Sequence, residues 1–194
     1  MLTAESLDIL FRKAHTHRAW LPKPVSDDLL RELYDLMKWG PTSANCCPVR
    51  ILFLRTPEAK QRLKPTLSPG NVDPAMKAPV TAVIAHDLKF YYQLPRLFPH
   101  NPAIRDLFAN SPELGAATAF RNGSLQGGYF ILAARSVGLD CGPMSGFDNA
   151  AVDRAFFAGT RIQSNFICSI GYGKPDSPFP RNPRLSFEEA GRFA

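Results

Sequence analysis

The spacing of apolar residues predicts several helices. The clearest lies between Ser26, a typical N-cap residue, and Gly40, because its apolar residues recur every three to four positions and fall on one face. Residues 121–137 are apolar on nearly every side, which predicts a helix at the centre of the molecule. The other expected helices are shorter and cover residues 4–15, 56–67 and 149–157.

Continuous apolar runs predict three buried strands, at residues 49–54, 79–86 and 164–173. Residues 68–74 and 138–148 contain glycine and proline and are expected to be loops. Residues 87–120 are rich in aromatic residues and proline and indicate no definite element; a small cluster packed under a loop would explain them. The pattern therefore predicts one domain over residues 1–194, long enough to bury a substantial core. Its helices and strands are compatible with an α+β fold without being diagnostic of one.

Composition narrows the classes of function. The formal net charge is +6, but Lys and Arg are scattered, so we expect anionic small molecules rather than nucleic acid as partners. The four cysteines lack metal-site spacing, and Cys46 and Cys47 are adjacent, which predicts free thiols in a reducing cytoplasm. No apolar run reaches ~18 residues and no signal peptide is visible, so a cytoplasmic protein without a membrane partner is expected.

A polar loop after the helix that ends near Gly40 is the first candidate site. Gly40 suits the left-handed position that follows a helix, and Pro41 prevents the helix from continuing. Thr42, Ser43 and Asn45 then offer two hydroxyls and one amide within a short stretch. These side chains could cap backbone groups in a tight turn, or they could bind a ligand on a rigid mount.

Basic residues gather near both ends of the chain. His15, Thr16 and Arg18 follow the first helix, and Arg181 and Arg184 lie near the C-terminus. Two arginines three positions apart can together bind one phosphate, although basic residues at a helix end are also favoured by the helix dipole alone. If the two ends of the chain meet, an anion site is expected between them.

A glycine-rich segment supplies the last candidates. Pro143, Met144, Ser145 and Gly146 lie in it, and glycine would allow a planar ring to rest against the backbone. A plain loop between two elements would explain the same residues. Asn71 is first of all a turn residue.

The sequence Trp-Gly-Pro-Thr-Ser-Ala-Asn-Cys-Cys-Pro at residues 39–48 resembles the Pro-Ser-x-x-Asn-x-Gln-Pro loop of the FMN-dependent nitroreductase family. Pro41, Thr42, Ser43 and Asn45 fall on that pattern, and a cysteine replaces the usual Gln. The Thr-Ser-Ala-Asn-Cys form is most similar to one branch, the malonic-semialdehyde reductases of pyrimidine breakdown. The resemblance covers essentially the whole chain.

The resemblance implies how FMN would be held. Residues 14–18, Ala-His-Thr-His-Arg, stand where the family has Arg-Arg-Ser-x-Arg, which binds the phosphate and ribityl chain. His15, Thr16 and Arg18 would take over three of those positions, but Ala14 replaces the first Arg, so other groups are expected to compensate.

The remaining implied contacts come from later in the chain. Arg181 and Arg184 resemble the family's second phosphate-binding element, and Asn71 and residues 143–146 would face the flavin ring. Ser145 stands where other branches often carry Glu, so the resemblance identifies no proton donor.

The implied fold is helices around a mostly antiparallel sheet in an intertwined homodimer, with FMN between subunits. The implied activity is ping-pong hydride transfer: NADPH or NADH would reduce flavin N5, and an acceptor would then take the hydride. Malonic semialdehyde, reduced to 3-hydroxypropionate, is the acceptor of the most similar branch; nitro compounds, quinones and enones are alternatives. A flavin-binding protein for storage or sensing is a further alternative. No side chain is assigned a catalytic role, since the cofactor does the chemistry.

Overall fold

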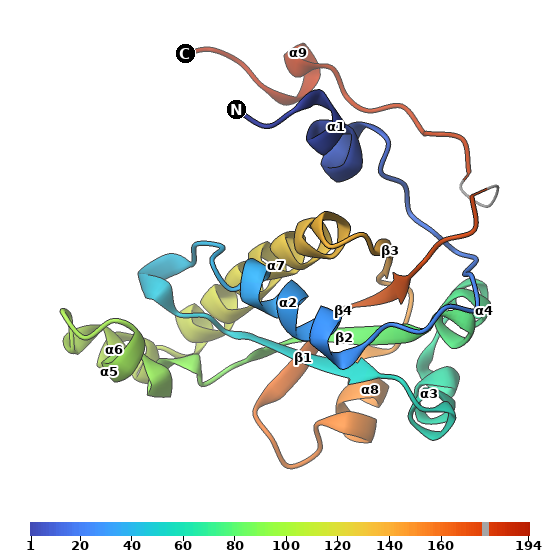
Figure 1. Ribbon diagram of the computed structural model, residues 1–194. Coiled ribbons are helices and arrows are strands. Elements are labelled where there is room, and N and C mark those ends of the chain that lie inside the picture. Colours follow the sequence, from blue (N-terminus) through green and yellow to red (C-terminus); the bar gives the residue numbers. More distant parts are fainter. Residues whose placement is uncertain (176–178) are drawn as a thin grey trace.

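The computed structural model describes residues 1–175 and 179–194, and a four-stranded sheet forms its centre (Figure 1). The strand order is β1-β2-β4-β3, and each neighbouring pair is antiparallel. The strands are β1 (Val49–Leu54), β2 (Val80–Asp87), β3 (Asp140–Met144) and β4 (Ile162–Gly171). Three of the four were predicted from their apolar runs.

The prediction of a loop at residues 138–148 was wrong for β3. This strand contains Gly142 and Pro143, which favour turns in most settings. It pairs with β4 alone within the sheet, because it lies at the edge. An edge strand tolerates proline because the missing N–H would have no strand partner on the open side.

Helices α2 (Asp27–Met37) and α7 (Pro112–Ser136) cover one face of the sheet (Figure 1). The hydroxyl oxygen of Ser26 accepts the N–H of Leu29 at 3.2 Å, which confirms the predicted N-cap of α2. Helix α7 begins well before the predicted start at residue 121. Its buried Phe130 packs with Leu33 of α2 and Ile84 of β2 in the largest apolar cluster of the protein.

The opposite face carries α3 (Pro57–Leu63), α4 (Pro69–Lys77) and α8 (Asn149–Phe156). Successive residues of β2 serve the two faces in turn: Ala82 and Ile84 belong to the first cluster, Val83 to the second. The prediction of a loop at residues 68–74 was wrong, since α4 occupies it. Tertiary packing overrides the turn signals here, because Ala75 is fully buried against this face.

Residues 87–120, for which the sequence indicated no element, form short helices and the start of α7. They are η4 (Phe90–Gln93), α5 (Leu94–Leu97) and α6 (Ala103–Ala109). Phe90, Leu94 and Phe108 make a third apolar cluster that also buries Cys46. The segment between β2 and α7 therefore packs directly under the polar loop that precedes β1.

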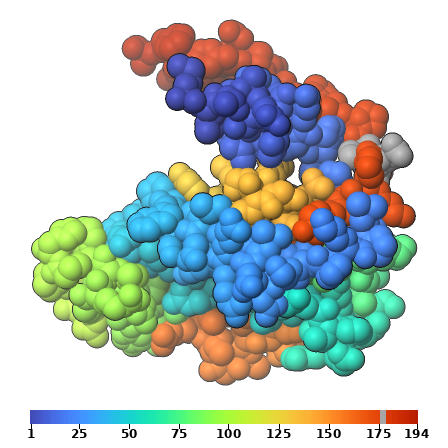
Figure 2. All heavy atoms as spheres, in the orientation of Figure 1, coloured from blue at the N-terminus to red at the C-terminus, as the bar shows by residue number. Residues whose placement is uncertain are grey.

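The two ends of the chain form an arm that stands off the body (Figures 1 and 2). The first helix is shorter than predicted: α1 (Ala4–Leu7) continues into the single wide turn η1 (Asp8–Arg12) and stops there. Helix α9 (Phe187–Ala190) lies beside it. Among residues 1–175 and 179–194, no helix has the length and apolar character needed to cross a membrane.

Candidate functional site

The segment that carries Thr16 and Arg18 runs along the edge strand β3. Thr16 forms an isolated parallel bridge with Cys141, and the N–H of His17 donates to the carbonyl oxygen of Cys141 at 2.9 Å. A side chain at Gly142 would overlap the carbonyl oxygen of His17, so glycine is required for this close approach. The N-terminal basic segment is thereby fixed next to residues 143–146.

Asn71 and Gly146 meet in the same region. The amide nitrogen Nδ2 of Asn71 donates to the carbonyl oxygen of Gly146 at 2.9 Å, and the backbone N–H of Ser68 donates to it at 3.0 Å. A Cβ on Gly146 would lie 2.6 Å from that Asn71 nitrogen, so the contact requires glycine. Arg18 donates to the carbonyl oxygen of Gly70, which joins the basic segment to the start of α4.

The basic residues of the two chain ends share one cavity of about 420 Å³. Arg181 joins the ends, since its Nη2 donates to the carbonyl oxygens of Arg12 at 2.7 Å and Ala14 at 2.8 Å. No Asp or Glu is among the described residues that line the cavity, so its positive charge is not neutralised from within. The lining residues are Phe11, Ala14, His15, Thr16, Arg18, Arg135, Phe179, Pro180, Arg181, Asn182 and Arg184.

His17 lies buried beneath this surface. Its Nε2 lies 3.3 Å from Oδ1 of Asp140, and the other carboxylate oxygen accepts the N–H of Gly173 at 2.8 Å. Burial lowers the pKa of His17, and the negative charge of Asp140 opposes that shift. A neutral imidazole at neutral pH adds no charge to the anion site and serves to pack the segment against β3.

The polar loop, residues 41–48, has an unusual backbone. Ala44, Asn45 and Cys47 have φ angles of 49°, 48° and 39°, in the left-handed region that non-glycine residues rarely adopt. The hydroxyl of Thr42 accepts the N–H of Cys47 at 3.2 Å, so one of the predicted ligand-binding side chains does cap a turn. Such strained positions concentrate at functional sites.

Gly40 does not have the predicted left-handed conformation. Among the described glycines, only Gly138 and Gly159 have positive φ. The reason for glycine at position 40 is space, because a Cβ there would lie 2.6 Å from Cγ of Tyr129 on α7. Gly138, at +80°, does end α7 as predicted.

Two neighbouring elements anchor the loop. The backbone N–H of Ser43 donates to Oδ1 of Asn122 on α7 at 2.9 Å. Asn45 donates through Nδ2 to the carbonyl oxygen of Leu97 at 2.9 Å, so the segment between β2 and α7 directly orients this side chain. Asn122 is buried and was missed by sequence reasoning; its spacing of four from buried Gln126 was the available signal.

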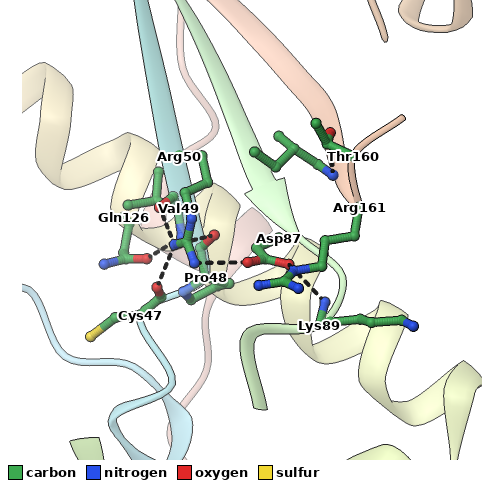
Figure 3. A network of polar contacts seen from close by, with 10 residues as sticks. Cys47, Pro48, Val49, Arg50, Asp87, Lys89, Gln126, Thr160 and Arg161 are labelled. Atoms are coloured by element: carbon green, nitrogen blue, oxygen red, sulfur yellow. Dashed lines mark hydrogen bonds and ion pairs between the residues drawn. The ribbon is translucent and has the colours of Figure 1, made fainter. Parts of the chain in front are cut away.

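A buried carboxylate holds the C-terminal end of the loop (Figure 3). Asp87 accepts Arg50 Nη2 at 2.8 Å, Arg161 Nε at 3.0 Å and the backbone N–H of Lys89 at 2.9 Å. Arg50 also donates through Nη1 to the carbonyl oxygen of Val49 at 2.8 Å. This network was not predicted; an Asp at the end of an otherwise apolar strand was its only sequence signal.

The candidate residues thus form two groups within one chain. His15, Thr16, Arg18, Arg181 and Arg184 line the basic cavity, next to the group of Asn71 and residues 143–146. The loop that carries Thr42, Ser43 and Asn45 lies at the other end of the sheet from α4 (Figure 1). Within one chain, the two groups of candidate residues therefore do not meet.

A model of the family described as "Nitroreductase family" matches residues 11–173. The chain belongs to the nitroreductase family. A nitroreductase relative from Cupriavidus pinatubonensis is 59% identical over 196 residues and covers all of both chains. A relative from Ralstonia pickettii, provisionally named NADH dehydrogenase/NAD(P)H nitroreductase HadB, is 58% identical over 197 residues, again with full coverage of both.

Solved structures agree with the nitroreductase fold. A structure from Exiguobacterium sibiricum, described as a nitroreductase in complex with FMN, aligns with a TM-score of 0.87 and covers 100% of this chain and 99% of its own. The two sequences are 20% identical, so the likeness is evidence for the fold. The predicted α+β architecture, with helices around an antiparallel sheet, is thereby confirmed.

Proposed function

We propose that this nitroreductase is an FMN-dependent NAD(P)H oxidoreductase formed by a single domain over residues 1–194. The observation that carries the proposal is the cavity between the chain ends, where four arginines and a histidine meet and none of the described lining residues is a carboxylate. Such a site favours a phosphate, which arginine binds with charge-assisted hydrogen bonds. Family membership and the FMN complex of a solved relative make FMN the phosphate-bearing ligand that we expect.

The chain's residues fit FMN at both ends of the cofactor. Arg18, Arg181 and Arg184 would hold the phosphate, with Thr16 on the ribityl chain. The strand end at residues 143–146, joined to Asn71 by the Gly146 contact, would support one edge of the ring. Donors there would stabilise negative charge on the reduced ring.

Bound FMN would supply two-electron hydride transfer between NAD(P)H and an acceptor. The chain itself would bind FMN, orient the ring and the substrates, and exclude water. No Ser-His-Asp set or paired carboxylate is required, and Cys46 is not a nucleophile, because burial raises the pKa of its thiol to about 11. Ser43 and Asn45, fixed by Asn122 and Leu97, would contact the ring from the second half-site.

The proposed protein is a homodimer, because the two half-sites are separate in one chain. In a symmetric pair, the loop of one subunit would approach the basic cavity of its partner. Exposed apolar residues on α7 and at the end of α2 support this arrangement. They are Trp39, Leu114, Phe120 and Leu125.

We propose malonic semialdehyde as the acceptor, reduced to 3-hydroxypropionate. The support is the Thr-Ser-Ala-Asn-Cys loop of that branch, together with a formal charge of +6 that favours an acidic substrate. His100 is exposed and lies in the segment after β2 whose Leu97 accepts from Asn45, so its ring offers a hydrogen-bonding group for a carboxylate. Nitro compounds, quinones and enones remain the alternative acceptors of the same site.

The test is anaerobic reduction of the purified protein. The visible spectrum should show a flavin band at ~450 nm that bleaches when NADPH or NADH is added. Malonic semialdehyde should restore the band in a second step, faster than a nitroarene or a quinone at equal concentration. A band that never bleaches would indicate a storage or sensing protein, and a colourless protein that takes up no FMN would refute the proposal.

A further inference from the structure

The basic cavity has a gap at the position where the resemblance leads one to expect an arginine. Ala14 lines the cavity, and its methyl group provides neither charge nor a hydrogen-bond donor. Its carbonyl oxygen is already used by Arg181. The N-terminal segment therefore carries one cation fewer than the motif that it resembles.

Arg135 enters the same cavity from a different element. It lies in the last turn of α7, about 120 residues later in the chain, and lines the cavity together with Ala14, His15 and Arg18. We propose that Arg135 supplies the phosphate-binding charge that Ala14 lacks, an inference that rests on the proposed function. The phosphate would thus be held by a helix of the core as well as by the two chain ends.

The hydrogen bonds of Arg135 leave donors for a ligand. Its Nη1 donates to the carbonyl oxygen of Leu10 at 2.9 Å, which fixes the direction of the guanidinium. That contact uses one of five N–H groups. Within residues 1–175 and 179–194, no carboxylate forms an ion pair with it.

Arg50 and Arg161 show the opposite arrangement. Both donate to the buried carboxylate of Asp87, which neutralises part of their charge and explains their presence structurally. Among the described residues, Arg135 forms no ion pair, although it is half-buried and also lines a neighbouring cavity that contains Asp8 and Asp140. Asp8 pairs with Arg12 and Lys13, and Asp140 contacts His17 and the N–H of Gly173, so these carboxylates are already used. Partial burial of a charge is costly unless a counter-ion is bound. An anion in the cavity would supply that counter-ion.

A purely structural role for Arg135, attaching η1 to α7 through Leu10, is the competing explanation. Arg135→Gln separates the two, because glutamine keeps a donor while removing the charge. Paired titrations of the apoprotein with FMN and with riboflavin, which lacks the phosphate, then isolate the phosphate contribution. Arg154→Gln, an exposed arginine on α8 across the sheet, is the matched control.

We expect Arg135→Gln to weaken FMN binding by about tenfold to a hundredfold, the range for a hydrogen bond to a charged group, and to change riboflavin binding by less than about twofold. Adding Ala14→Arg to Arg135→Gln should restore most of the FMN affinity. Arg154→Gln should change neither affinity.

Two results would overturn the assignment. One is an FMN affinity that does not change in Arg135→Gln; the other is a parallel loss of FMN and riboflavin affinity, which leaves their ratio unchanged and which Ala14→Arg does not rescue. A wild-type protein that binds FMN no better than riboflavin would instead refute the proposed phosphate site, and the assignment with it. Failure of the assignment alone would leave the wild-type preference for FMN intact.

Discussion

A buried polar side chain affects stability most where it has no hydrogen-bond partner. His86 on β2 is buried, and its Nδ1 has no hydrogen-bond partner among the described residues. Its ring meets the ring of Phe120 edge-on at a centroid distance of 5.9 Å. Burial lowers the pKa of His86, against the opposing effect of Asp153 and Asp87, so the folded protein favours the neutral ring.

Stability should therefore fall as the pH drops through the unfolded-state pKa of histidine, about 6.5, because the unfolded chain then binds more protons than the folded one. His86→Leu removes this contribution, while His17, shifted in the same direction, retains its own. Urea unfolding at pH 7.5, 6.5 and 5.5 should show a smaller loss of unfolding free energy for His86→Leu than for wild type. The exposed His100, replaced by Asn, is the control, and equal losses in His86→Leu and wild type would contradict the prediction.

Elements are held in register by contacts that local sequence does not reveal. Asp87 ends β2 and joins Arg50 of β1 to Arg161, which immediately precedes β4. Arg50 in turn holds the carbonyl oxygens that lead out of the polar loop. Three strands and the polar loop are thus linked through one carboxylate.

Asp87→Asn should destabilise the protein by about 1–3 kcal/mol, because it leaves two partly buried guanidinium groups without a counter-charge. The arginines are partly exposed, which keeps the cost below that of a fully buried pair. Asp106→Asn, which breaks the exposed pair with Arg105, should cost less than about 0.5 kcal/mol. Urea denaturation measures the unfolding free energy of both variants. A similar loss in the two would show that Asp87 stabilises the protein no more than an exposed ion pair does.

The sequence predicted elements well where the signal was local. The apolar runs located β1, β2 and β4, and Ser26 correctly marked the start of α2. Glycine and proline made β3 and α4 look like loops. The edge position in the sheet accounts for β3, and the burial of Ala75 accounts for α4. The short helices of residues 87–120 depend on packing around Phe90, which periodicity does not encode.

The candidate site was only partly predictable for the same reason. Motif residues such as Thr16 and Asn45 could be identified from their neighbours in sequence. Arg135 could not, since it reaches the cavity from a helix that is distant in sequence. Nor could a single sequence show that the Asn45 loop lies apart from the basic cavity, because that depends on the direction of α7 through the molecule.

At the scale of the whole molecule, exposed apolar residues on α7 and after α2 fit the proposed homodimer. Leu114 and Leu125 lie three helical turns apart on α7, so they share one face, and both are more than 40% exposed (43% and 45%). Trp39, at the end of the adjoining α2, is 80% exposed. Exposed large apolar residues on neighbouring helices are typical of a surface that another chain covers. The terminal arm also stands off the body (Figure 2).

The proposed dimer, with each FMN site shared between two subunits, predicts complementation between two defective variants. Asn45→Ala damages the loop half-site and Arg184→Ala the basic half-site, so each variant alone should bind FMN at least about tenfold more weakly than wild type. In a mixed dimer, both substitutions fall in one site and the other site is intact. Co-expression in equal amounts should make half of the dimers mixed, so about a quarter of all sites should regain wild-type affinity.

Differently tagged copies allow the mixed dimer to be captured and titrated with FMN. One high-affinity site per captured dimer is the expected result. Mixed dimers without any such site would mean that each chain builds its site alone, because both of its sites would then carry one substitution.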